Sequence, residues 1–126
     1  MQGNIFGDNS TVKKRKTTTD ATETTVYSIK VGEGQAVKVY ADVTAKDAAP
    51  SLLGGFDIHA IFSRQAAGDV TKQGYTDGLP INKTPGSDID CDFVADTVNQ
   101  QVNFVVTGVA ATTINWSAKI RTEVLS

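Results

Sequence analysis

Residues 112–124 (TTINWSAKIRTEV) impose the strongest constraint on the fold, because apolar and polar side chains alternate along almost their whole length. Ile114, Trp116 and Ile120 fall on one side of the segment, and the residues between them are polar, charged or small. A repeat of two is the side-chain period of a β-strand with one buried face. The segment therefore predicts a long strand that covers one side of a hydrophobic core.

The same period recurs through the chain, and Gly, Pro and Asp separate most of the alternating segments. These segments are residues 25–31, 36–45, 55–64, 69–78, 88–95 and 100–108. No segment has a helical period over ten or more residues, and short strands at this spacing are typical of β-sandwiches. We predict an all-β fold, a single β-sandwich of seven or eight antiparallel strands. The Cys-Trp-Cys pattern of immunoglobulins is absent, which favours a jelly-roll-like arrangement.

A chain of 126 residues fits one domain. Residues 1–24 have no clear period and are rich in turn formers and Thr, so we expect an extended N-terminal arm there and the β-sandwich in residues 25–126. Ile5 and Phe6 could insert into an apolar pocket of a partner. The four consecutive cations Lys13, Lys14, Arg15 and Lys16 would then act as a charged clamp on an acidic neighbour.

The charges are unevenly distributed, although the net charge is only −2. That balance does not favour direct nucleic-acid binding by the whole domain. Asp88, Asp90 and Asp92 alternate along one segment, which predicts an acidic strand that faces solvent or a partner, including the basic arm of a neighbouring copy. A calcium site is a weaker alternative, because Asn99 stands where an EF-hand loop would have its terminal Glu.

Catalytic chemistry has little support in the sequence. His59 is the single histidine and falls on a polar face, while Ser63 and Asp57 lack the context of a nucleophile. Cys91 and Trp116 fall on apolar faces and are interpreted as core residues, with an exposed sugar-stacking Trp116 as the alternative. We assign no catalytic, cofactor or metal residues and expect no enzyme activity. No signal peptide or run of 18 apolar residues is present, so we expect a soluble protein without a membrane partner.

Three short motifs point to a known family. Thr19-Asp20-Ala21-Thr22 precedes the first strand, residues 37–45 have the form V-x-V-x-A-x-V-x-A, and Thr113-Ile114-Asn115-Trp116 begins a strand that ends in Glu-Val. Over about 100 residues, this pattern resembles a small β-sandwich module of tailed-bacteriophage structural proteins. Glu23 departs from the Pro that often follows the first motif, and the chain is nearly the module alone.

The resemblance implies a virion structural protein. A capsid decoration or cement protein fits best: a homotrimer made in the host cytoplasm that binds the major capsid protein, or another virion protein, at the capsid surface through its arm. It needs no cofactor. One alternative is a tail-fibre or receptor- and glycan-binding tip that uses Tyr40, Tyr75 or Trp116. Another is a non-viral β-sandwich binding module.

Overall fold

The computed structural model describes residues 9–47, 52–75, 80–83 and 89–126, which form nine β-strands. The strands are β1 (Asn9–Thr18), β2 (Glu23–Lys30), β3 (Ala36–Asp47), β4 (Leu52–Ser63), β5 (Thr71–Tyr75), β6 (Pro80–Lys83), β7 (Asp90–Asp96), β8 (Gln101–Thr107) and β9 (Ile114–Leu125). This part of the chain contains no helix that is long and apolar enough to cross a membrane. The all-β prediction is confirmed.

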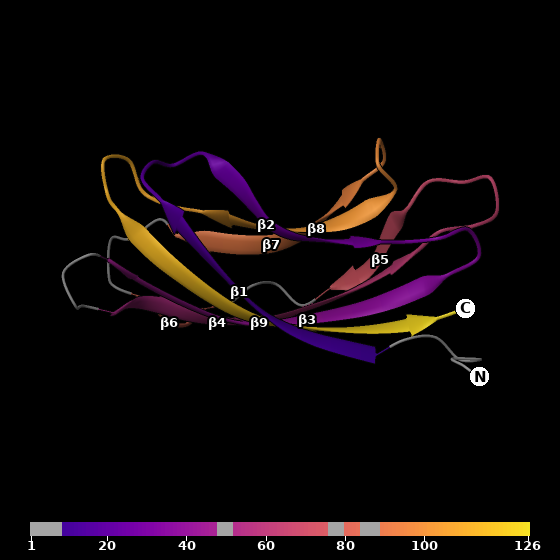
Figure 1. Ribbon diagram of the computed structural model, residues 1–126, viewed down its shortest axis with the longest axis horizontal. Coiled ribbons are helices and arrows are strands. Elements are labelled where there is room, and N and C mark those ends of the chain that lie inside the picture. Colours follow the sequence, from indigo (N-terminus) through magenta and orange to yellow (C-terminus); the bar gives the residue numbers. More distant parts are fainter. Residues whose placement is uncertain (1–8, 48–51, 76–79, 84–88) are drawn as a thin grey trace.

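The strands form two antiparallel sheets that lie one over the other (Figure 1). The larger sheet has the order β1-β9-β3-β4-β5, with β6 also paired to β4, and the smaller sheet has the order β2-β8-β7. Strand β2 lies over β1, while β7 lies over β4 and β5. The sandwich is therefore confirmed. It has more strands than expected, because β1 falls in the expected arm and β6 in a segment expected to be a loop.

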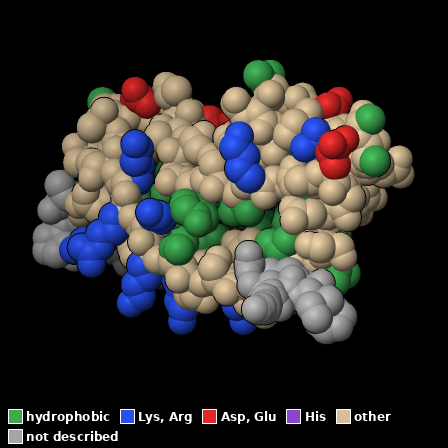
Figure 2. Space-filling model, turned by 45° about the vertical axis from the view of Figure 1, so that its right-hand side comes forward, with side chains coloured by type: hydrophobic (Ala, Val, Ile, Leu, Met, Phe, Trp, Pro, Cys, Tyr) green, Lys and Arg blue, Asp and Glu red, His purple; other side chains and the backbone are tan. Residues whose placement is uncertain are grey.

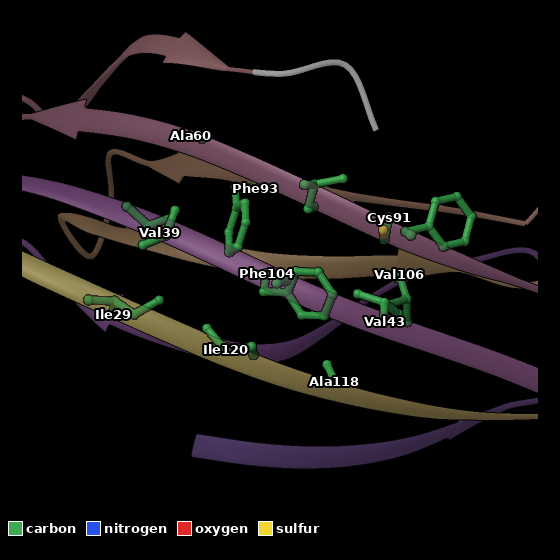
Figure 3. Close-up of a cluster of buried hydrophobic side chains, with 14 of the residues drawn as sticks. Ile29, Val39, Val43, Ala60, Cys91, Phe93, Phe104, Val106, Ala118 and Ile120 are labelled. Carbon is green, nitrogen blue, oxygen red and sulfur yellow. The ribbon is translucent and has the colours of Figure 1, made fainter. Parts of the chain in front are cut away.

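The hydrophobic core lies between the sheets and is built from alternate residues of their strands (Figure 3). Phe93 and Phe104 of the smaller sheet pack against each other at 5.3 Å between ring centroids. Burying one side chain of this size stabilises the folded state by roughly 1.5–3 kcal/mol. Cys91 and Trp116 are also buried, at 4% and 2% exposure, so both are core residues as expected. Burial raises the pKa of the Cys91 thiol, and the neighbouring Asp90 and Asp92 raise it further.

Residues 9–18 differ from the arm expected there. They form an edge strand that pairs with β9 from Asn9↔Glu123 to Thr18↔Ile114. The run of four cations hides the period of this strand, because a long Lys or Arg side chain can reach water from either side of a sheet edge. Its inward positions are marked instead by half-buried Val12 and buried Thr18. Residues 9–18 thus belong to the sandwich, whereas Ile5 and Phe6 lie outside the described residues.

A hydrogen bond holds the end of β1 against β9. The indole Nε1 of Trp116 donates to the hydroxyl Oγ1 of Thr18 at 2.9 Å, inside the protein. Gly108 packs directly beneath this contact. A Cβ at residue 108 would lie 2.5 Å from Thr18 Oγ1 and 2.7 Å from the carbonyl oxygen of Asp20. The close approach of these two chain segments therefore requires glycine at position 108.

We predict that Gly108→Ala lowers the free energy of unfolding by about 2 kcal/mol, because the added methyl group must push the Thr18–Asp20 backbone away from the core. Gly74→Ala is the matched control, since a Cβ at Gly74 would have no atom within 4 Å. Urea denaturation followed by the fluorescence of the single tryptophan measures both variants. Equal stability of the two variants would contradict the packing described for Gly108.

Candidate functional site

The outer face of the larger sheet carries the polar positions of β1, β9, β3 and β4. The antiparallel register aligns these positions in rows that run across the four strands. In strand order, one row consists of Lys13, Lys119, Asp42 and Asp57. All four residues are exposed. The row thus presents two cations followed by two carboxylates, and we call it the charged row.

The adjacent row is centred on Tyr40 of β3. The Arg121 guanidinium lies 3.9 Å from the centroid of the Tyr40 ring, and the His59 ring meets that ring edge-on at 5.0 Å. The Lys38 ammonium lies 5.2 Å from the same centroid. Contacts of this kind hold an aromatic ring in place at a polar surface. The two rows together line a shallow depression of about 400 Å³, formed by Thr11, Tyr40, Asp42, Asp57, His59, Lys119 and Arg121.

Only part of the charge in this depression is paired with an opposite charge in the described part of the chain. His59 Nε2 lies 3.4 Å from Asp57 Oδ1, and Arg121 Nε lies 3.4 Å from Glu123 Oε2. Asp42 and Lys119 are opposite each other in register, yet among the described residues neither has an ion-pair partner within 4.0 Å. The face can therefore bind cationic groups, anionic groups and neutral hydrogen-bonding groups.

The open edge of β1, with Lys13, Lys14, Arg15 and Lys16, is here called the basic edge. All four side chains are exposed. Register places Lys13 and Arg15 on the outer face, whereas Lys14 and Lys16 point towards the smaller sheet, where the Lys14 ammonium lies 5.3 Å from the Tyr27 ring centroid. Figure 2 shows Lys and Arg side chains on both sides of an apolar strip between the layers. In the described part of the chain, β9 alone pairs with β1.

The expected acidic strand is β7, at the other side of the sandwich. Asp90 and Asp92 are exposed, while Asp88 lies outside the described residues. The carboxylate of Asp92 accepts a hydrogen bond from Lys72 Nζ of β5 at 3.3 Å. Since β7 lies over β4 and β5, the acidic strand and the basic edge do not meet within one chain. No group of three or more His, Cys, Asp or Glu side chains within the described ranges could hold a metal ion.

The aromatic residues considered for a glycan platform are arranged unfavourably for stacking on a sugar. Trp116 is buried, and Arg121 covers one side of the half-buried Tyr40 ring. The side chain of Tyr75 lies outside the described residues. Sequence reasoning did not find the grouping of Asp42, Lys119 and Arg121 around Tyr40, because only the register between strands brings these polar positions together.

The turn between β7 and β8 contains a second polar cluster that the sequence did not reveal. The Asp96 carboxylate accepts hydrogen bonds from the Asn99 side chain and backbone, from the Val98 backbone N–H and from the Asn103 side chain. These bonds, those of Asn99 first, lower the pKa of Asp96 from its ordinary value of 3.8 to about 2. The cluster fixes the turn.

No family model and no curated protein matches the sequence. A tailspike protein gp49 from Acinetobacter baumannii bacteriophage Fri1, a capsular polysaccharide depolymerase, is 9% identical with a TM-score of 0.43. The likeness covers 94% of this chain and 19% of that one. The Acinetobacter baumannii phage AM24 tailspike protein is 10% identical with a TM-score of 0.44, over 91% of this chain and 26% of that one. These values describe distant likenesses and assign no activity, substrate or partner to this chain.

We predict that Asp96→Asn destabilises the protein at neutral pH and that the difference from wild type narrows as the pH falls from about 4 to about 2. The native pKa is depressed, so the contribution of the carboxylate is present above 3.8 and is lost as the pH falls through about 2. Urea denaturation at several pH values measures the difference. Asp20→Asn is the control, because in the described part of the chain the Asp20 side chain accepts one hydrogen bond, from the Thr22 N–H. A difference that does not change with pH would contradict the assignment.

Proposed function

We propose that this protein is a non-enzymatic structural protein of a tailed-bacteriophage virion, and that it binds an acidic surface of another virion protein through its basic edge. The observation that carries the proposal is an open edge strand of ten residues with four consecutive exposed cations. The phage assignment rests on the motif resemblance, whereas the mode of binding rests on this edge.

The basic edge is suited to an extended acidic segment. The free side of an edge strand presents backbone N–H and C=O groups that can pair with an added strand. Lys13 and Arg15 would contact such a segment from one face, and Lys14 and Lys16 from the other. Charged residues also protect sheet edges against aggregation, but here four cations are concentrated in one strand of a chain whose net charge is −2.

On a particle, the partner would be the major capsid protein, and the role would be that of a decoration or cement protein. A protein that binds only the assembled shell stabilises it by linkage. Many equivalent copies act together, so each contact can be modest. A tail-associated location is the alternative, and it uses the same edge.

Two features support a role without catalysis. Cys91 is buried and its pKa is raised, so it does not offer an accessible thiolate. His59 and Asp57 lie together on an exposed face beside Arg121 and Tyr40. The hydroxyl groups among the residues that line the depression are those of Thr11 and Tyr40. This arrangement is that of a binding surface.

We predict that Lys14→Ser/Lys16→Ser weakens binding to phage particles about tenfold, because exposed ion pairs contribute roughly 0.2–1 kcal/mol each. Co-sedimentation with purified capsid shells and, separately, with purified tails measures the affinity and identifies the location. Binding should also weaken as sodium chloride is raised.

Lys38→Ser/Lys46→Ser is the matched control, since both cations lie on β3, two strands from the open edge. This control should bind as wild type does. Equal losses in the two double variants, or no loss in either, would exclude the basic edge as the attachment site.

A further inference from the structure

The charged row places like charges opposite each other at both of its ends within a single chain. Lys13 lies directly opposite Lys119 in the register of β1 and β9, and Asp42 lies directly opposite Asp57 in the register of β3 and β4. Like charges directly opposite each other on neighbouring strands destabilise a sheet. The row contains two such pairs, one of each sign, and they lie side by side on the outer face.

The order of the charges makes the row complementary to itself. Read across the sheet, the signs are plus, plus, minus, minus. A half-turn about an axis that is parallel to the strands and lies between β9 and β3 reverses this order. We propose that two copies of this chain pair outer face to outer face about such a twofold axis. Lys13 then faces Asp57 of the second copy, and Lys119 faces Asp42 of the second copy.

The adjacent row also matches itself under this half-turn. Its order is Thr11, Arg121, Tyr40 and His59, so the half-turn brings Arg121 of one copy against Tyr40 of the other. Arg121 already lies 3.9 Å from the Tyr40 ring centroid of its own chain. The depression of about 400 Å³ between the two rows leaves room for the long side chains of the second copy. Both rows thus satisfy one symmetry operation.

The size of the face is sufficient for a specific but weak interface. Four strands spaced about 4.8 Å apart and about ten residues long, at roughly 3.3 Å per residue, cover roughly 600 Å² on each copy. The total of about 1,200 Å² is at the lower limit of standard interfaces. A second copy is the favoured occupant because symmetry alone supplies the complementary order of charges. The pair is twofold, unlike the homotrimer that the resemblance implies.

Sedimentation velocity of the full chain tests the proposal. We expect a monomer–dimer equilibrium at low salt that shifts to monomer as sodium chloride is raised, because screening weakens the four intermolecular ion pairs. Lys13→Glu/Lys119→Glu makes the whole charged row negative, and Asp42→Lys/Asp57→Lys makes it positive. For each variant alone, the dissociation constant of the dimer should rise by at least about a hundredfold. Mixed together, the two variants should form a one-to-one complex.

Lys16→Glu/Lys30→Glu is the matched control, because it changes the net charge equally without touching the charged row. It should dimerise as wild type does, and circular dichroism checks that every variant is folded. Wild type that stays monomeric at about 1 mM in low salt overturns the proposal. So does a wild-type trimer, or reversed variants that fail to pair when mixed. Lys14→Ser/Lys16→Ser should leave dimerisation unchanged. The outer-face dimer and the attachment to particles through the basic edge can therefore be disproved independently of each other.

Discussion

The structure depends on the register of β9, which is hydrogen-bonded to β1 on one side and to β3 on the other. Because side chains alternate with a period of two, a slip of one residue would bring Trp116 and Ile120 to the solvent and Lys119 into the core. The hydrogen bond from Trp116 to Thr18 opposes such a slip on the β1 side, and Gly108 leaves the space that this contact needs.

The same register determines the surface. Once the apolar side chains of β9 and β3 point inward, their polar neighbours must point outward and align in rows with those of β1 and β4. The charged row and the stack of Arg121 on Tyr40 are therefore consequences of the strand order, and neither depends on a loop. A binding surface carried by four paired strands is held rigidly and requires little ordering on binding.

Alternation in single segments was enough to predict seven of the nine described strands, the sandwich and the burial of Cys91 and Trp116. It could not predict what depends on pairing. Asp42 and Lys119 are 77 residues apart in the sequence and become neighbours only through the register of β3 and β9. The strand character of residues 9–18 was hidden for a different reason, because consecutive cations show no apolar period even where an edge strand accommodates them.

The strand conformation of residues 13–16 divides the basic segment between two surfaces. A run of four cations in a flexible arm would be a single patch of charge, but in a strand consecutive side chains point to opposite sides. Lys13 and Arg15 join the outer face beside Lys119, whereas Lys14 and Lys16 point towards the smaller sheet, where Lys14 lies over the Tyr27 ring. One edge strand can thus contribute charge to two separate surfaces. Pairing with a second copy through the outer face would leave Lys14, Lys16 and the open backbone of β1 available for another protein.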